Sequence, residues 1–167
     1  MKTPIKLSLL FLVIVCSFNA NAQQTAKQIK QQEKSARITN KINARKYTFV
    51  AEYVQPLGGT QKYLTTEYDL RITKDSVIAY LPYFGRVYMD VPYNPDDDGI
   101  KFASTKFDYK VEPKKKGGWI ITIKLNDVRR TSQLIIEVFT NGTATLQANS
   151  NSRDPINFLG YIKDDDK

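Results

Sequence analysis

From Tyr47 almost to the C-terminus, apolar and polar residues alternate with a period of two. This alternation is typical of strands that bury one face, because successive side chains of a strand point to opposite sides of the sheet. The first run places Tyr47, Phe49, Ala51 and Tyr53 on the buried face. The later runs have apolar faces made of Tyr68, Leu70 and Ile72; Phe107, Tyr109 and Val111; Trp119, Ile121, Ile123 and Leu125; Leu134, Ile136 and Val138; Ala144, Leu146 and Ala148; and Ile156, Phe158 and Ile162.

Turn-forming dipeptides separate these runs where hairpins need them: Gly58-Gly59, Lys74-Asp75, Gly117-Gly118 and Asn141-Gly142. Asn-Gly is the strongest short hairpin signal, because both residues tolerate positive φ. With Val77–Leu81 and Ile100–Ser104 included, the sequence predicts nine strands. We expect a mostly β fold, an antiparallel meander that closes as a barrel or a two-sheet sandwich, with an N-terminal helix. Alternation alone does not separate the two closures.

Residues 1–22 have the three parts of a secretory signal peptide. Two early lysines precede an apolar run of 12 residues, and Ala20-Asn21-Ala22 supplies the cleavage site. The run is too short for a transmembrane helix, which needs about 20 apolar residues. We therefore expect an exported product, periplasmic or secreted, with no transmembrane segment. Lipoprotein anchoring through Cys16 is the less favoured alternative, because Val15 stands where such signals place a small residue.

Residues 23–46 are predicted to form a basic leader helix, since they are rich in Gln, Lys and Ala and contain no Gly or Pro. Their apolar residues form no single stripe, because Ile29 lies nearly opposite Ile38 and Ile42. One interpretation is a helix that binds an anionic membrane surface or an acidic partner. We favour a helix that packs its C-terminal end onto the domain through Ile38 and Ile42.

The rest of the chain divides into a β domain at residues 47–163 and a charged tail at residues 164–167. From Tyr47 onward, sixteen Lys or Arg residues balance sixteen Asp or Glu residues, so the net charge of +8 belongs to the signal peptide and the helix. A folded body without a positive excess is a poor match for a phosphate backbone. We expect no nucleic-acid partner.

The mature chain contains neither His nor Cys, because the sequence has no histidine and its one cysteine, Cys16, lies in the signal peptide. This composition excludes a Ser-His-Asp triad, a cysteine nucleophile, a disulfide and the usual zinc and iron sites. No cofactor and no metal site are predicted. Enzymatic activity is left open, and the composition argues against it.

The segment from Pro82 to Gly99 breaks the alternation with three prolines and two glycines, and the residues around its start are rich in aromatic rings. One interpretation is a ligand-binding surface in which Arg86 anchors an anion. The interpretation we favour is that the rings close one end of the core beneath an irregular connection. The candidate ligand-binding residues are Tyr80, Tyr83, Phe84, Arg86, Tyr88 and Tyr93.

Other charged groups are interpreted as ordinary surface chemistry. Asp96-Asp97-Asp98 lacks the spacing of a calcium-binding EF-hand loop, so we read it as a solvated turn. Glu67 and Asp69 share a strand face, as the carboxylates of a glycosidase would share a cleft, but Arg71 on that face indicates salt bridging. Arg129-Arg130 falls at a predicted turn, where basic clusters are usually solvated.

Several segments together resemble an exported Bacteroidetes family. They are Tyr68 to Ile72, Asp75 to Arg86, Ile100 to Phe102 and Val138 to Leu146, and the most specific of them is Leu81-Pro82-Tyr83-Phe84-Gly85-Arg86. The family is known as domain-of-unknown-function family number 4251. The resemblance runs from the N-terminal helix to Ile162 and implies an exported domain with a leader helix. It implies no activity and no catalytic residue.

Three functions fit these observations. The first is a non-catalytic binding module of the cell envelope, for a small apolar or amphipathic ligand or for an envelope protein or glycan partner. The second is a hydrolase of glycans or lipids that uses carboxylates in place of His or Cys. The third is a structural assembly component. A carrier predicts an internal apolar cavity of about a few hundred Å³, a hydrolase predicts two carboxylates facing across a cleft, and an assembly component predicts an exposed apolar patch.

Overall fold

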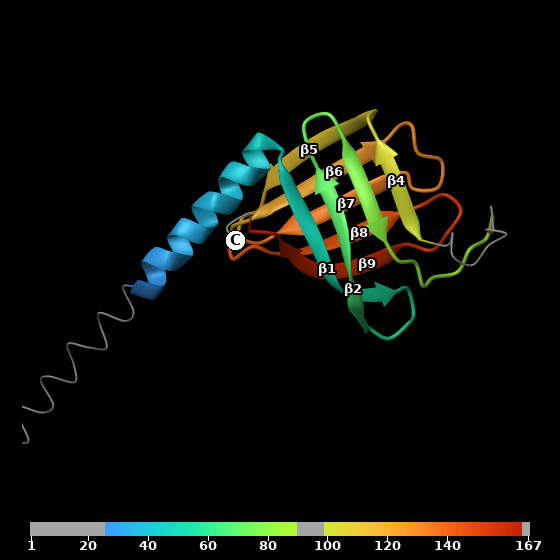
Figure 1. The fold of residues 1–167 in the computed structure, drawn as a ribbon, viewed down its shortest axis with the longest axis horizontal. Coiled ribbons are helices and arrows are strands. Elements are labelled where there is room, and N and C mark those ends of the chain that lie inside the picture. Colours follow the sequence, from blue (N-terminus) through green and yellow to red (C-terminus); the bar gives the residue numbers. More distant parts are fainter. Residues whose placement is uncertain (1–25, 90–98, 165–167) are drawn as a thin grey trace, which may run out of the picture.

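The structure, a computed structural model, describes residues 26–89 and 99–164. Within these residues, nine antiparallel strands form a single sheet in the order β4-β3-β2-β1-β9-β8-β7-β6-β5. Figure 1 shows that the sheet curls into a nearly closed barrel, so of the two predicted closures the barrel is the one observed. The strands are β1 (Tyr47–Pro56), β2 (Lys62–Ile72), β3 (Val77–Leu81), β4 (Ile100–Ser104), β5 (Phe107–Pro113), β6 (Trp119–Leu125), β7 (Gln133–Val138), β8 (Thr143–Asn149) and β9 (Ile156–Ile162).

The barrel interior is filled by the alternating apolar residues, as the sequence predicts. Phe49 and Phe158 are the largest fully buried side chains, and aliphatic residues from the other strands pack around them. The predicted turns are also present. At the β7–β8 hairpin, Gly142 has a φ of 84°, a value that a glycine adopts without strain. The Asn141 side-chain oxygen accepts a hydrogen bond from the Thr143 amide at 3.0 Å, which stabilises the same turn.

The prediction that Tyr53 faces the core is wrong. A β-bulge between Ala51 and Tyr53 shifts the register of β1 against both β2 and β9, so that Tyr53 is 37% exposed while Val54 is fully buried. The extra residue of a bulge turns every later side chain to the opposite face. Val111 is a second departure from the predicted core: it is exposed because β5 is an edge of the sheet.

The barrel is left open between its two edge strands, β4 and β5. These strands are consecutive in the chain but are not paired with each other: within the described residues, β4 pairs with β3 and β5 pairs with β6. The β6–β7 connection, residues 126–132, lies across their junction. The Asn126 amide donates to the Lys106 carbonyl at 2.8 Å. The Asp127 carboxylate accepts bonds from the amides of Thr105 and Lys106 at 3.0 and 3.1 Å and from the Ser104 hydroxyl. We call this open junction the seam.

The N-terminal helix covers residues 26–44 of the described chain and projects away from the barrel (Figure 1). Its C-terminal end packs on the barrel through Ile38 and Ile42, which are 0% and 1% exposed, as predicted. The Lys41 ammonium donates to the Lys163 carbonyl at 2.6 Å, and Arg37 lies 3.7 Å from the Asp164 carboxylate. The helix is thus attached by two isoleucines and by polar contacts to the end of the described chain.

Candidate functional site

Residues 82–89 follow β3 and lie at the end of the barrel where β3 ends and β4 begins. We call them the closing segment. Tyr83 is only 7% exposed, and its hydroxyl donates to the carbonyl oxygens of Arg86 at 2.8 Å and Asp154 at 3.0 Å. Val87 forms an isolated antiparallel bridge with Arg153, whose guanidinium lies 4.9 Å from the centre of the Tyr83 ring. Tyr83 therefore belongs to the core, as the interpretation that the rings close one end of it expects. Phe84 and Tyr88 do not fit that interpretation, because they are 46% and 63% exposed.

Tyr88 and Arg86 belong to the same closing segment but reach solvent. The Tyr88 amide donates to the Ser152 carbonyl at 2.8 Å, and its hydroxyl donates to the Asp154 carboxylate. This hydrogen bond raises the pKa of the Tyr88 phenol, because the neighbouring carboxylate disfavours a phenolate. The Arg86 carbonyl accepts the Asp154 amide at 3.0 Å. The backbone of this segment is therefore held in place while the Arg86 side chain is exposed.

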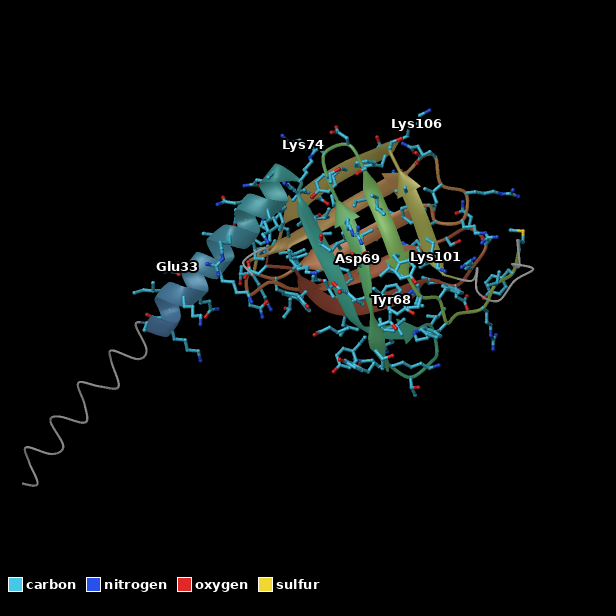
Figure 2. The ribbon with its side chains drawn as sticks, in the orientation of Figure 1. Glu33, Tyr68, Asp69, Lys74, Lys101 and Lys106 are labelled. Atoms are coloured by element: carbon cyan, nitrogen blue, oxygen red, sulfur yellow. The ribbon has the colours of Figure 1, made fainter. Side chains whose placement is uncertain are left out.

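Tyr80 lies on the outer side of the barrel. Its ring is 45% exposed and stacks on Tyr68 of β2, with ring centres 5.5 Å apart. Lys101, the residue paired with Tyr80 on β4, places its ammonium 5.5 Å from the Tyr80 ring centre. Asp69 is the residue paired with Tyr80 on β2, and Figure 2 shows Asp69 and Lys101 on the two strands that flank β3. Tyr80 thus presents an aromatic surface beside a cation.

A second ring and cation lie just beyond the end of β3. Phe84 is 46% exposed, and the Lys62 ammonium lies 4.9 Å from its ring centre. Next to Lys62, Tyr63 packs edge-on against Tyr53 with ring centres 5.3 Å apart. The aromatic face, as the term is used below, consists of four exposed rings and one half-buried ring. The exposed rings are Tyr53, Tyr63, Tyr80 and Phe84, and the half-buried ring is Tyr68, which packs against the core and stacks on Tyr80.

The six predicted ligand-binding residues therefore separate into groups. Tyr80 and Phe84 lie on the aromatic face, Tyr83 is in the core, and Arg86 and Tyr88 are on the closing segment. Tyr93 lies outside the described residues. The assignment of these residues to ligand binding stays a prediction.

Sequence reasoning did not single out Lys62, Tyr68 and Lys101 as site residues. Each comes from a different stretch of the chain than the aromatic-rich segment, and only strand pairing brings them beside Tyr80 and Phe84.

The carboxylates considered for hydrolysis are held in salt bridges. Asp69 pairs with Arg71 at 2.8 Å, as the sequence analysis expects, and Glu67 pairs with Lys163 at 2.9 Å. The Lys163 hydrogen bond lowers the pKa of the Glu67 carboxyl, so this group is held in its charged form. Across the described residues, no three His, Cys, Asp or Glu side chains gather to form a metal site.

Two sizeable cavities lie along the described residues, and both open to the surface. One, of about 530 Å³, follows the free edge of β4, and the other, of about 320 Å³, lies over the outer side of β7, β8 and β9.

The helix is the longest helical element described, and no helix in the described chain is long and apolar enough to cross a membrane.

Comparison with known proteins agrees with this architecture. The family model of the domain of unknown function DUF4251 matches residues 29–162, from within the helix to the end of β9. The chain belongs to the DUF4251 family. The match covers the region of the sequence resemblance, so the expected family membership is confirmed.

A solved DUF4251 structure shares the fold. It is the crystal structure of a DUF4251 family protein from Bacteroides eggerthii, with a TM-score of 0.59 and 15% sequence identity; the likeness covers 77% of this chain and 86% of that one. No curated protein matches the chain. Membership of DUF4251 therefore establishes the family and the fold, and the function has to be argued from the surface of this chain.

Proposed function

We propose that this DUF4251 protein is a non-catalytic binding module of the cell envelope that contacts its envelope partner through the aromatic face. The observation that carries the proposal is the gathering of exposed rings on neighbouring strands, two of them beside lysine ammonium groups. Scattered apolar residues are normal on a protein surface, whereas a group of adjacent ones is typical of a binding site. Tyrosine suits such a site because it offers an apolar ring and a polar hydroxyl.

The filled interior favours a surface site over a carrier. Phe49 and Phe158 occupy the centre together with buried Leu70, Ile121 and Leu146, each at 2% exposure or less. A carrier for an apolar ligand would instead need an enclosed cavity of about 300 Å³ or more. The small-ligand version of the hypothesis therefore receives less support than contact with an envelope partner.

Export is part of the proposal and is supported by the signal-peptide pattern of residues 1–22. Native mass spectrometry of the protein purified from its own envelope tests export and interior filling together. We expect the mass of a chain that begins at Gln23, without a retained small molecule. An added lipid-like mass would make the protein a carrier, and a chain that still begins at Met1 would refute the export signal.

Variants of the aromatic face test the binding surface. We expect purified protein to cosediment with washed cell envelopes, and the double substitution Tyr80→Ala with Phe84→Ala to lower the bound fraction at least about tenfold. Phe139→Ala is the matched control, because Phe139 is also exposed and also carries a lysine, Lys114, 4.9 Å from its ring centre. Equal binding by wild type and by the double variant would contradict the proposal.

A further inference from the structure

The groove of about 320 Å³ on the outer side of the barrel crosses four neighbouring strands, β7, β8, β9 and β1. Strand pairing arranges its lining residues in rows across the sheet. In the first row, Ile135 of β7 lies opposite Gln147 of β8. Asn157 of β9 lies between Gln147 and Gln55 of β1. Residues opposite each other on neighbouring strands point to the same face of a sheet, so three amide side chains stand next to one another in this groove.

These three amides are not used by the fold. Within the part of the chain that the structure describes, the side chains of Gln55, Gln147 and Asn157 make no hydrogen bond. The neighbouring amide pair on the same face behaves differently, because Asn149 Nδ2 donates to Gln133 Oε1 at 3.3 Å. Each amide has two N–H donors and an oxygen acceptor. The groove therefore presents a row of donors and acceptors that are available to a ligand.

The second row joins the groove to the aromatic face. Leu159 of β9 lies opposite Thr145 of β8 on one side and opposite Tyr53 of β1 on the other. Tyr53 is in turn opposite Tyr63 of β2, and the two rings pack edge-on. The amide row and the rings of Tyr53 and Tyr63 thus belong to one continuous outer surface.

The β-bulge in β1 makes this surface continuous. It turns Tyr53 and Gln55 to the outer side, where both are exposed, while Val54 between them enters the core. Without the bulge, the alternation of the strand would direct both residues into the barrel. Bulges are over-represented next to active sites, where they re-aim a side chain.

The groove has little charge. Among the described residues that line it, Glu137 is the one with an ionisable side chain, and its carboxylate forms an ion pair with Lys114. Charged partners are recognised through complementary charge, which this lining does not offer. A neutral ligand with many hydroxyl groups would instead find donors and acceptors side by side.

We infer that the groove binds a neutral glycan. The inference rests on the proposed function and names the chemistry of the envelope partner. Hydroxyl groups of the glycan bond to the three amides, and the apolar face of a sugar ring packs on the half-buried side chains of Ile135 and Leu159. Neighbouring strands lie about 4.8 Å apart, so the amide row spans about 10 Å, the length of two linked sugar rings. The rings of Tyr53 and Tyr63 extend the contact to further sugars.

Cosedimentation of the mature protein with three preparations of washed cell envelopes tests the inference. One preparation is untreated, one is digested with protease, and one is oxidised with periodate and then quenched. Protease removes protein partners, whereas periodate cleaves the vicinal diols of sugars. We expect binding to survive protease digestion and to be lost after periodate oxidation.

A double variant locates the site. Gln147→Ala with Asn157→Ala should lower binding to untreated envelopes at least about tenfold, because it removes two of the three hydrogen-bonding side chains. Gln133→Ala with Asn149→Ala is the matched control, since it removes the same two residue types from the same face outside the groove lining. The control should bind like wild type. Both double variants should keep the wild-type melting temperature, which separates a loss of binding from a loss of folding.

Binding that withstands periodate would overturn the inference. Binding that protease abolishes would overturn it as well, because the partner would then be a protein, but the proposed function would still stand. Wild-type binding by the Gln147, Asn157 double variant would show that the groove is not the site. The proposed function fails differently, through equal binding of untreated envelopes by wild type and by the Tyr80, Phe84 double variant. Absence of wild-type binding to untreated envelopes would contradict both.

Discussion

A β-carbon added to Gly160 would lie 1.8 Å from the carbonyl oxygen of Val50. Gly160 pairs with Ala51 in the β1–β9 ladder, at the place where the bulge shifts the register. Close approach of one backbone to another is a common reason for glycine inside a strand. The bulge that turns Tyr53 outward therefore depends on the absence of a side chain at residue 160.

Gly160→Ala should accordingly destabilise the fold by about 3 kcal/mol, since the added methyl must push two paired strands apart. Urea denaturation measures the change. Gly59→Ala in the exposed β1–β2 turn, where the nearest atom to an added β-carbon is the Pro56 side chain at 3.3 Å, should cost less than about 1 kcal/mol. A Gly160→Ala protein as stable as wild type would refute the close approach.

The helix offers a matched pair of substitutions. Ile38→Ala should lower the free energy of unfolding by about 3 kcal/mol, because it removes a fully buried side chain between helix and barrel. Ile29→Ala should change it by less than about 0.5 kcal/mol, because Ile29 is exposed on the projecting part of the helix. Equal effects in urea denaturation would mean that the helix does not dock as described.

Tyr83 should behave as a core residue in stability measurements. Tyr83→Phe removes one hydroxyl that donates to two carbonyl oxygens, and we expect a loss of about 1–2 kcal/mol. Tyr83→Ala removes the ring as well and should cost about 3–5 kcal/mol. Thermal denaturation should show little change for Tyr80→Phe, the exposed counterpart. A Tyr83→Ala protein with wild-type stability would show that Tyr83 is not a core residue and would favour its role as a surface ligand contact.

The seam should weaken in acid. The folded state lowers the pKa of the Asp127 carboxyl below its ordinary value near 4. The carboxylate therefore contributes stability above the unfolded-state pKa, and this contribution is lost as the pH falls through the lower folded-state value. Denaturation midpoints between about pH 6 and pH 2 should fall less steeply for Asp127→Asn than for wild type. Asp75→Asn, in the exposed β2–β3 turn, should keep the wild-type slope, and an unchanged slope in Asp127→Asn would rule out this role.

Local pattern was sufficient for most of the architecture. Alternation and turn dipeptides predict each strand and its order along the chain, and the two isoleucines near the end of the helix predict how it docks. These features depend on residues a few positions apart. The bulge was not predicted because Tyr53 is apolar and continues the alternation of β1 in the sequence, although it faces outward in the structure. The isolated Gly160 within a strand was the available signal.

The candidate surfaces were harder to predict, because they join residues that are distant in the chain. Tyr80 and Phe84 were found from their local aromatic density, but their partners Lys101 and Lys62 come from other strands. Tyr83 lies between Tyr80 and Phe84 in the sequence, and the local pattern does not separate it from them. Its hydroxyl donates to the carbonyl oxygen of Asp154, which is 71 residues away in the chain. Likewise, the sequence around Arg129-Arg130 indicates a solvated turn, whereas in the structure both residues line a cavity together with residues of β4.

The central claim is that the aromatic face, and not the barrel interior, meets the partner. Oxidative footprinting of the protein with and without washed cell envelopes tests it most directly, because it reports which rings lose contact with solvent. We predict that Tyr63, Tyr80 and Phe84 become protected on binding while Phe139, exposed elsewhere on the barrel, does not. Protection confined to Phe139 or to the helix, or no protection at all, would contradict the account.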